Sequence, residues 1–340
     1  MKLYPMVLTP FVSETVWGGR RLIDEYSVVT DKRNAAEAWV MSAHKNGSST
    51  VANGEFAGRT LREVYLEHPE LGGKNCAGFS DFPVLIKFID AAADLSVQVH
   101  PDDAYCLKKG SGAGKTESWY ILDCEPGAYL LLGFEKDITR EQFRQSITDG
   151  TLTDYVKKVP VKKGDFFFIE SGTLHAICKG ILLAEVQQNS DTTYRIYDYG
   201  RLGFDGKPRE LHVEDAVNVT HTGVYKNPCT PKKDGNATNL VACPFFTERV
   251  LDIDGSFDGT ADEKSFVSLL ILDGAGSLGF SDYRWSVVYA QTGTITTSDR
   301  EKKTDISYAL ERYDALFEKL RPASYRLKSG TSGRTHTGLV

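Results

Sequence analysis

The segment LSVQVHPDDAYCLKKGSGAGKTESWYIL, residues 95–122, contains the most informative pattern in the chain. Apolar and polar residues alternate over 96–100, which is typical of a half-buried strand. Side chains two residues apart on a strand point to the same face, so Gln98 and His100 are expected to lie together. The Pro, Asp and Gly residues that follow favour a loop, and a second strand is expected to begin near Lys115.

The second predicted strand carries Glu117 and Trp119 on one face. If the two strands lie side by side, an amide, an imidazole and a carboxylate meet, and these ligands suit a borderline divalent metal such as zinc. Zinc usually takes about four ligands, so the chain needs another histidine on a neighbouring strand. His175 meets this need, because it opens a predicted strand within GDFFFIESGTLHAI, residues 164–177.

Length and composition are those of a soluble globular protein. The 340 residues are enough for two domains, and the 41% hydrophobic and 25% charged content is ordinary. A net charge of −6 gives no reason to expect nucleic-acid or membrane binding. The N-terminal MKLYPMVLTPF lacks the apolar core of a signal peptide. The six cysteines contain no CxxC pair, which favours free thiols and a cytoplasmic location over a disulfide framework.

Three polar residues have open interpretations at this point. Lys87 lies inside the apolar segment PVLIKFID, where an amine is costly unless it reaches solvent or a partner. It is therefore either an edge lysine that reaches solvent or a charge directed into a pocket. Lys115 is either a solvated loop residue or a neighbour of Glu117 on the same strand face. His44 is expected on the surface or in the core rather than as a ligand.

The combination of QVHPDD, KTE and SGTLHAI resembles the type I mannose-6-phosphate isomerases of the short bacterial branch, which are cupins. The segments WGG at 17–19 and AEAWVMS at 36–42 continue the resemblance, with Ala36 where the family usually has Gly. Two residues depart from the second cupin motif: Glu170 replaces the usual Pro and Lys179 the usual Asn. Neither position is a ligand in the family.

The resemblance implies one Zn²⁺ per chain, with other divalent metals as alternatives. The four implied ligands are Gln98, His100, Glu117 and His175. The SD..YR spacing matches the family's catalytic segment, so the resemblance implies a catalytic Arg195 and a substrate-binding Asp191. It also implies that Lys115, which faces the pocket in the family, is catalytic, and that Trp17, in a segment close to the pocket, binds substrate. Core packing is the alternative for Trp17, and solvated stacking on tyrosines is the alternative for Arg195.

The implied reaction interconverts mannose 6-phosphate and fructose 6-phosphate through a cis-enediol, with the metal as a Lewis acid. A guanidinium at Arg195 suits either of two tasks: binding the phosphate dianion or stabilising an enediolate. Lys115 suits either proton relay or binding of a hydroxyl or phosphate oxygen of the substrate. The isomerisation needs no redox cofactor. The sequence also has no P-loop and no dinucleotide fingerprint after a strand.

The predicted fold is mainly β: a cupin jelly-roll domain with small helical inserts over residues 1–226, then a partial second cupin over 240–280. Residues 283–340 resemble the intramolecular chaperone domain of phage tail spikes, in truncated form, and would add a foreign α+β tail with a helix over 308–320. In that family a Ser–Lys pair cleaves the chain, and the corresponding residues here are Ser298 and Lys303.

Two functions of other classes compete with the isomerase. One is a non-catalytic cupin that binds a sugar or metal, and it would need Lys115 or Arg195 turned away from the metal. The other is a phage structural fusion protein. A monomer acting on a small sugar phosphate is expected, and a trimer only if the C-terminal segment is functional.

Overall fold

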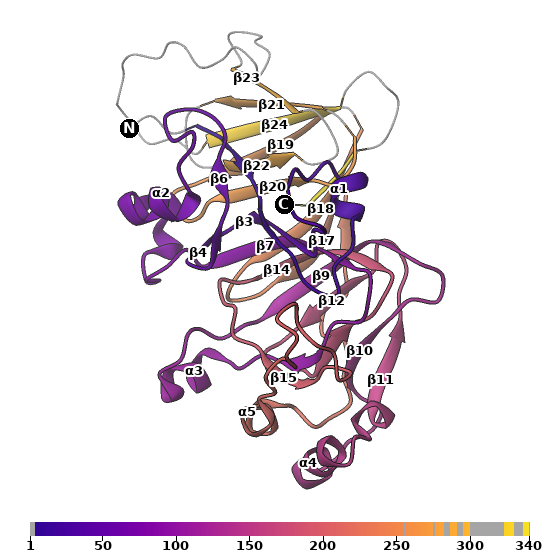
Figure 1. Ribbon diagram of the computed structural model, residues 1–340. Helices are drawn as coiled ribbons and strands as arrows, with labels where there is room; N and C mark the ends of the chain where they lie inside the picture. The colour runs from indigo at the N-terminus through magenta and orange to yellow at the C-terminus, as the bar shows by residue number, and fades with distance from the viewer. Residues whose placement is uncertain are drawn as a thin grey trace.

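The structure is a computed structural model. It describes residues 4–254, 256–274 and 276–281, together with the backbone of four further strand segments, 286–290, 295–299, 323–329 and 336–339. The fold is mainly β with a few short helices (Figure 1). None of the helices that the structure describes has the length and apolarity needed to cross a membrane. The six cysteines are free, as predicted.

A six-stranded antiparallel sheet lies at the centre of the molecule. Its strands, in spatial order, are β12 (Phe166–Ile169), β9 (Glu117–Cys124), β14 (Ile181–Gln188), β7 (Val84–Ala91), β3 (Glu37–Met41) and β2 (Phe11–Ser13). All eight residues of β7 and all eight of β14 are buried, because both faces of this sheet are covered.

A five-stranded sheet packs against one face of the central sheet and completes the jelly-roll sandwich. Its order is β11 (Val156–Pro160), β10 (Tyr129–Phe134), β13 (His175–Ile177), β8 (Val97–Val99) and β15 (Tyr194–Tyr197). The core between the two sheets joins side chains such as Trp119 and Leu183 from the first to Leu132 and Ile177 from the second. The predicted cupin-like fold is confirmed.

Short helices connect the strands and lie at the outside of the molecule (Figure 1). They are α1 (Arg21–Asp24), α2 (Leu61–Glu67), η1 (Pro69–Gly72), η2 (Lys74–Cys76), α3 (Asp103–Lys109), α4 (Arg140–Thr148), η3 (Leu152–Asp154) and α5 (Val213–Val219). Thr60 caps α2 and Thr139 caps α4, each in a reciprocal capping box that satisfies the first free N–H groups of the helix.

Helix α3 was not expected, since the segment after His100 was predicted to be a loop. Asp102 accepts a hydrogen bond from the backbone N–H of Tyr105 and so caps the first turn. Gly110, at φ 65°, ends the helix in the left-handed conformation. The Pro-Asp-Asp sequence that looked like a turn signal is therefore a helix start, and only the glycines from Gly110 onward form the loop.

The remaining strands form two further sheets and a two-stranded ribbon. The eight-stranded sheet has the order β16 (Lys232–Asp234), β17 (Ala237–Ala242), β18 (Thr247–Ile253), β25 (His336–Leu339), β20 (Val267–Ile271), β22 (Ser286–Ala290), β1 (Met6–Thr9) and β6 (Thr50–Val51). The four-stranded sheet has the order β19 (Ser256–Ala261), β24 (Ala323–Ser329), β21 (Gly276–Ser281) and β23 (Ile295–Asp299). The ribbon pairs β4 (Ala43–His44) with β5 (Gly47–Ser48). Strands β19, β21 and β24, orange to yellow in Figure 1, lie at the end of the molecule opposite α4 and α5.

The backbone of the segment compared with a phage chaperone thus contributes strands to the same sheets as residues 237–281. Ser298 lies in β23, whose side chains are not described, and Lys303 and the predicted helix over 308–320 lie outside the described residues. The self-cleaving pair, the chaperone resemblance and the proposed domain limits stay predictions.

Strand β18 is attached to the central sheet through a buried carboxyl group. Ser118, on the outer face of β9, donates a hydrogen bond to Glu248, whose second oxygen is buried without a partner in the described structure. Burial raises the pKa of Glu248 to about 7, and the Ser118 hydrogen bond only partly opposes this. The same contact region buries apolar side chains such as Val186 and Leu270.

Replacing Glu248 by Gln is expected to stabilise the protein more at pH 8 than at pH 5. A carboxyl group with a folded pKa near 7 favours folding at low pH, and this contribution is lost as pH rises from 4.5 through 7. Glutamine keeps an acceptor for Ser118 but cannot ionise, so the gain at pH 8 should be about 1–3 kcal/mol.

The measurement is the thermal midpoint of both proteins at the two pH values. Glu55→Gln, at an exposed position, serves as the control and should show no pH-dependent difference. A Glu248→Gln effect of the same size at pH 5 and pH 8 would count against a buried ionisable contact.

Candidate metal centre

The two facing sheets bring together the four predicted metal ligands. His175 on β13 is the direct cross-strand partner of Gln98 on β8, so their side chains point to the same face. His100 follows β8 directly, and Glu117 opens β9 in the opposite sheet. The ligand atoms of His100, Glu117 and His175 lie within 4.8 Å of one another, and all three residues are buried.

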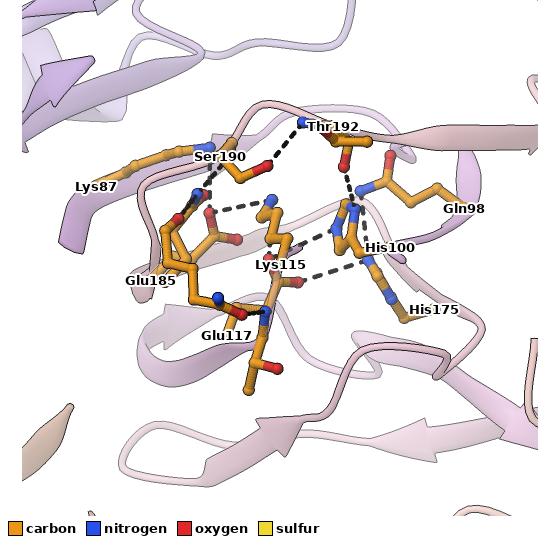
Figure 2. A network of polar contacts seen from close by, with 12 residues as sticks. Lys87, Gln98, His100, Lys115, Glu117, His175, Glu185, Ser190 and Thr192 are labelled. Carbon is orange, nitrogen blue, oxygen red and sulfur yellow. Dashed lines mark hydrogen bonds and ion pairs between the residues drawn. The ribbon is translucent and has the colours of Figure 1, made fainter. Parts of the chain in front are cut away.

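The carboxylate of Glu117 lies between the two imidazoles. Its Oε2 is 3.6 Å from Nε2 of His100, and its Oε1 is 3.5 Å from Nε2 of His175. The amide nitrogen of Gln98 is 3.3 Å from the same His175 nitrogen. Figure 2 shows the four side chains converging from three chain segments, since Gln98 and His100 share one of them. The geometry therefore brings the predicted set into one cluster, with Gln98 at its edge.

Backbone carbonyls fix the orientation of both imidazoles. Nδ1–H of His100 donates to the carbonyl of Thr192 at 2.9 Å, and Nδ1–H of His175 donates to that of Thr173 at 2.8 Å. Because a carbonyl only accepts, the hydrogen lies on Nδ1 and each Nε2 keeps its lone pair toward Glu117. Burial lowers the pKa of His175 to about 4 and that of His100 well below its ordinary value, so both rings are neutral at pH 7.

The unsatisfied atoms of this cluster fit a divalent cation. Nε2 of His100 and Oε1 of Glu117 are buried without a hydrogen-bond partner in the described structure, and Oε2 of Glu117 is buried in an ion pair with Lys115. Burial and the nearby charge of Glu185 raise the pKa of Glu117 to about 7, while Lys115 opposes the shift. Two neutral imidazoles and a carboxylate are donors that zinc takes, and a bound cation would keep the carboxylate ionised. The side chain of Gln98 would ligate through its oxygen, which requires the opposite orientation of the amide from the one that places its nitrogen near His175.

Lys115 and three further charged residues extend the cluster along the inner face of the central sheet. Nζ of Lys115 lies 2.9 Å from Glu117 and 3.8 Å from Oε1 of Glu185. Oε1 of Glu185 is also 3.1 Å from Nζ of Lys87 (Figure 2). Nζ of Lys87 in turn lies 3.6 Å from Glu37. Lys115 is buried beside Glu117, so the alternative of a solvated loop lysine is wrong.

The interpretation of Lys87 as an edge lysine is also wrong. Lys87 lies on the central strand β7, is only 6% exposed, and is the direct cross-strand partner of Glu185. Burial alone lowers the pKa of Lys87, but Glu185 and Glu37 outweigh it and the pKa lies above its ordinary value. Glu185 itself was missed, although a carboxylate within the apolar run ILLAEV was a signal equal to that of Lys87.

Arg195 lies next to the cluster in the five-stranded sheet. It is the cross-strand partner of Gln98, and its Nε donates to Ser96 Oγ at 3.3 Å. Nη1 donates to the carbonyl of Glu210 at 3.0 Å. No carboxylate of the described residues lies within ion-pair distance of this guanidinium, and burial, followed by the charge of Arg209, lowers its pKa.

Two other predicted residues lie apart from the ligands. Asp191 accepts a hydrogen bond from Asn46 at 2.6 Å, and its other oxygen is 3.7 Å from Nε2 of His44. His44 is buried against the ring of Trp39, in agreement with the expectation that it is not a ligand. Trp17 is 4% exposed within the core between the sheets, so core packing accounts for its position.

Comparison with known proteins gives a consistent set of relatives. The catalytic domain of phosphomannose isomerase type I matches residues 6–120. The probable mannose-6-phosphate isomerase GmuF of Bacillus subtilis is 46% identical over 244 residues, covering 70% of this chain and 76% of the relative. The mannose-6-phosphate isomerase of Streptococcus mutans is 43% identical over 255 residues, covering 74% of this chain and 80% of the relative.

Solved structures agree in fold. The crystal structure of the mannose 6-phosphate isomerase from Bacillus subtilis superposes with a TM-score of 0.78 at 32% identity and covers 98% of both chains. A mannose 6-phosphate isomerase bound with zinc and yttrium superposes with a TM-score of 0.64 at 16% identity, covering 98% of both chains, which is a likeness of fold alone.

Removing one imidazole is expected to empty the centre. Purified wild-type protein should hold about one zinc per chain, and His100→Ala should hold less than about a tenth of that, because the remaining donors are too few. Metal content by mass spectrometry of the native protein checks this. His44→Ala removes another buried histidine and should keep full zinc content; equal losses in both variants would argue against this centre.

Proposed function

The chain belongs to the phosphomannose isomerase type I family, and from this we propose that its buried His–Glu–His cluster is the centre that interconverts mannose 6-phosphate and fructose 6-phosphate. The observation that carries the assignment to these residues is the convergence of His100, Glu117 and His175 from two facing sheets, with Lys115 2.9 Å from the same carboxylate. The activity itself is that of the relatives that match most of the chain.

The isomerisation moves one proton between C2 and C1 through a cis-enediol and another between the two oxygens. A bound Zn²⁺ supplies Lewis acidity toward this pair of oxygens. We propose that His100, Glu117, His175 and Gln98 hold it, with both imidazoles neutral because burial lowers each pKa. The carbonyls of Thr192 and Thr173 keep the two Nε2 lone pairs directed inward.

Lys115 is proposed to hold the oxygen that gains negative charge as the enediol forms. Its ammonium group is buried and lies on the strand face that carries Glu117, within reach of the ligand cluster. A charged donor in a water-poor site stabilises a developing oxyanion more strongly than it would in water. The sequence left two tasks open for Lys115, proton relay and oxygen binding. Both tasks require its ammonium group to lie beside the ligand cluster.

Arg195 is proposed to contact the substrate from the neighbouring strand. It shares a sheet face with Gln98, and its guanidinium has no carboxylate of the described residues to neutralise it. A permanently charged planar donor is suited to a phosphate dianion or an enediolate. Asp191, partly exposed and fixed by Asn46, is proposed to accept a hydrogen bond from a sugar hydroxyl. Core packing remains the better-supported role of Trp17.

The protein is proposed to act in the cytoplasm on a free sugar phosphate, as a monomer. The free cysteines and the phosphorylated substrate favour that location. For residues 283–340 the chaperone resemblance, with self-cleavage by Ser298 and Lys303 and a possible trimer, remains a separate proposal.

Activity of the full chain tests the proposed function. The zinc-loaded protein is expected to convert mannose 6-phosphate to fructose 6-phosphate, detected by enzyme-coupled spectrophotometry. Dialysis against a chelator should abolish conversion and added Zn²⁺ should restore it, because the metal supplies the electrophile. A folded protein with one zinc per chain and no conversion would exclude the proposal.

Arg195→Lys is expected to lower kcat by about 100- to 1000-fold, since lysine keeps the charge but loses the planar, two-pronged donor. The thermal midpoint should change little. Arg144→Lys on α4, where the side chain is 45% exposed, is the matched control and should keep wild-type kcat. If Arg195→Lys kept the wild-type kcat, the proposal that Arg195 contacts the substrate would be wrong.

A further inference from the structure

We propose that Glu185 is a positioning residue that holds the ammonium group of Lys115 in place when Glu117 is engaged with the metal. This inference rests on the proposed function of Lys115. It concerns a carboxylate on β14 that is not among the predicted ligands and lies within the charged cluster of Figure 2.

The environment of Glu185 fixes the direction of its carboxylate. The indole N–H of Trp119 donates to Oε2 at 2.9 Å, and Trp119 is the direct cross-strand partner of Glu185 on β9. The other oxygen, Oε1, is turned toward the two ammonium groups, at 3.1 Å from Lys87 and 3.8 Å from Lys115. Oε1 has no partner with hydrogen-bond geometry in the described structure, so it remains available to a closer donor.

Lys115 lies near two carboxylates, and metal binding changes how strongly each of them attracts its ammonium group. Glu117 is the nearer at 2.9 Å and Glu185 the farther at 3.8 Å. Once the charge of Glu117 is shared with a divalent cation, its attraction for Lys115 falls and the cation repels the ammonium group. Glu185 is then the remaining carboxylate that the described residues offer to Lys115.

Lys87 depends less on Glu185 than Lys115 does. Glu37 lies 3.6 Å from Nζ of Lys87, and the ring of Trp39 lies 5.3 Å from it in a cation–π arrangement. Lys87 therefore keeps a counter-charge and an aromatic partner if Glu185 is neutralised. Lys115 in the metal-loaded protein does not, and a buried ammonium group without a partner moves toward solvent or loses its geometry.

Glu185→Gln is the variant that tests this inference. Glutamine has nearly the same volume and keeps an oxygen for the Trp119 indole, but it removes the charge. We expect kcat to fall about 10- to 100-fold, with KM changed less than about threefold and zinc content unchanged. The thermal midpoint is measured in parallel, since a large drop would indicate a structural role only.

Two double-mutant cycles identify the residue through which Glu185 acts. In a Lys115→Met background, Glu185→Gln should lower kcat by no more than about twofold, because the group that it positions is gone. In a Lys87→Met background, the two losses should multiply. Multiplying losses with Lys115→Met, or strong coupling with Lys87→Met instead, would overturn the inference.

A readout independent of activity separates this inference from the proposed function. Crystal structures of the zinc-loaded wild type and of Glu185→Gln should differ at Lys115. In the wild type, Nζ should approach Oε1 of Glu185 to within about 3.2 Å, and in the variant it should be displaced or disordered. An unmoved Lys115 would refute the role of Glu185, whereas an inactive wild type with Lys115 held by Glu185 would refute only the isomerase assignment.

Discussion

The buried carboxylate of Glu117 is the feature that constrains the rest of this protein. Its oxygens are buried between two sheets, and their nearest charged partner is the ammonium group of Lys115 at 2.9 Å. An isolated charge in such a place is too costly, so it must be offset by a cation or removed by a proton. This free-energy cost explains the groups that surround Glu117. They are two neutral imidazoles, the ammonium group of Lys115, and Glu185, which balances the charge of that ammonium group.

The strand register of the jelly-roll sandwich places the groups that offset the charge of Glu117. In the five-stranded sheet, His175, Gln98 and Arg195 form one row across three strands. In the facing sheet, a row runs across four strands and places an ion pair between two aromatic rings; its members are Trp119, Glu185, Lys87 and Trp39. Because both rows face the same interior, charges from strands that are distant in the sequence balance one another within a few ångströms.

The outer layers keep this interior closed. Helices α4 and α5 cover the five-stranded sheet, and the C-terminal strands cover the central one. Strand β9 contributes side chains to both of its faces. Glu117 and Trp119 point inward to the charged cluster, while Ser118 points outward to Glu248 on β18. A single strand thus links the metal centre to the second packing interface, which is why its register admits little variation.

Local sequence determined much of this protein. Strand periodicity put Gln98 beside His100 and Lys115 beside Glu117. Motif spacing supplied the second imidazole, His175, and the family likeness. Helix α3 was missed because its proline, aspartates and glycines serve equally as turn signals.

Tertiary structure alone decided which strands became neighbours and in what register. The pairing of Lys87 with Glu185 joins residues far apart in the chain, and no local pattern fixes such a register. The same holds for Ser118 with Glu248 and for the burial of Trp17. The physical reason is that spacing within a strand sets which face a side chain occupies, whereas the partner across that face depends on how the whole sandwich closes.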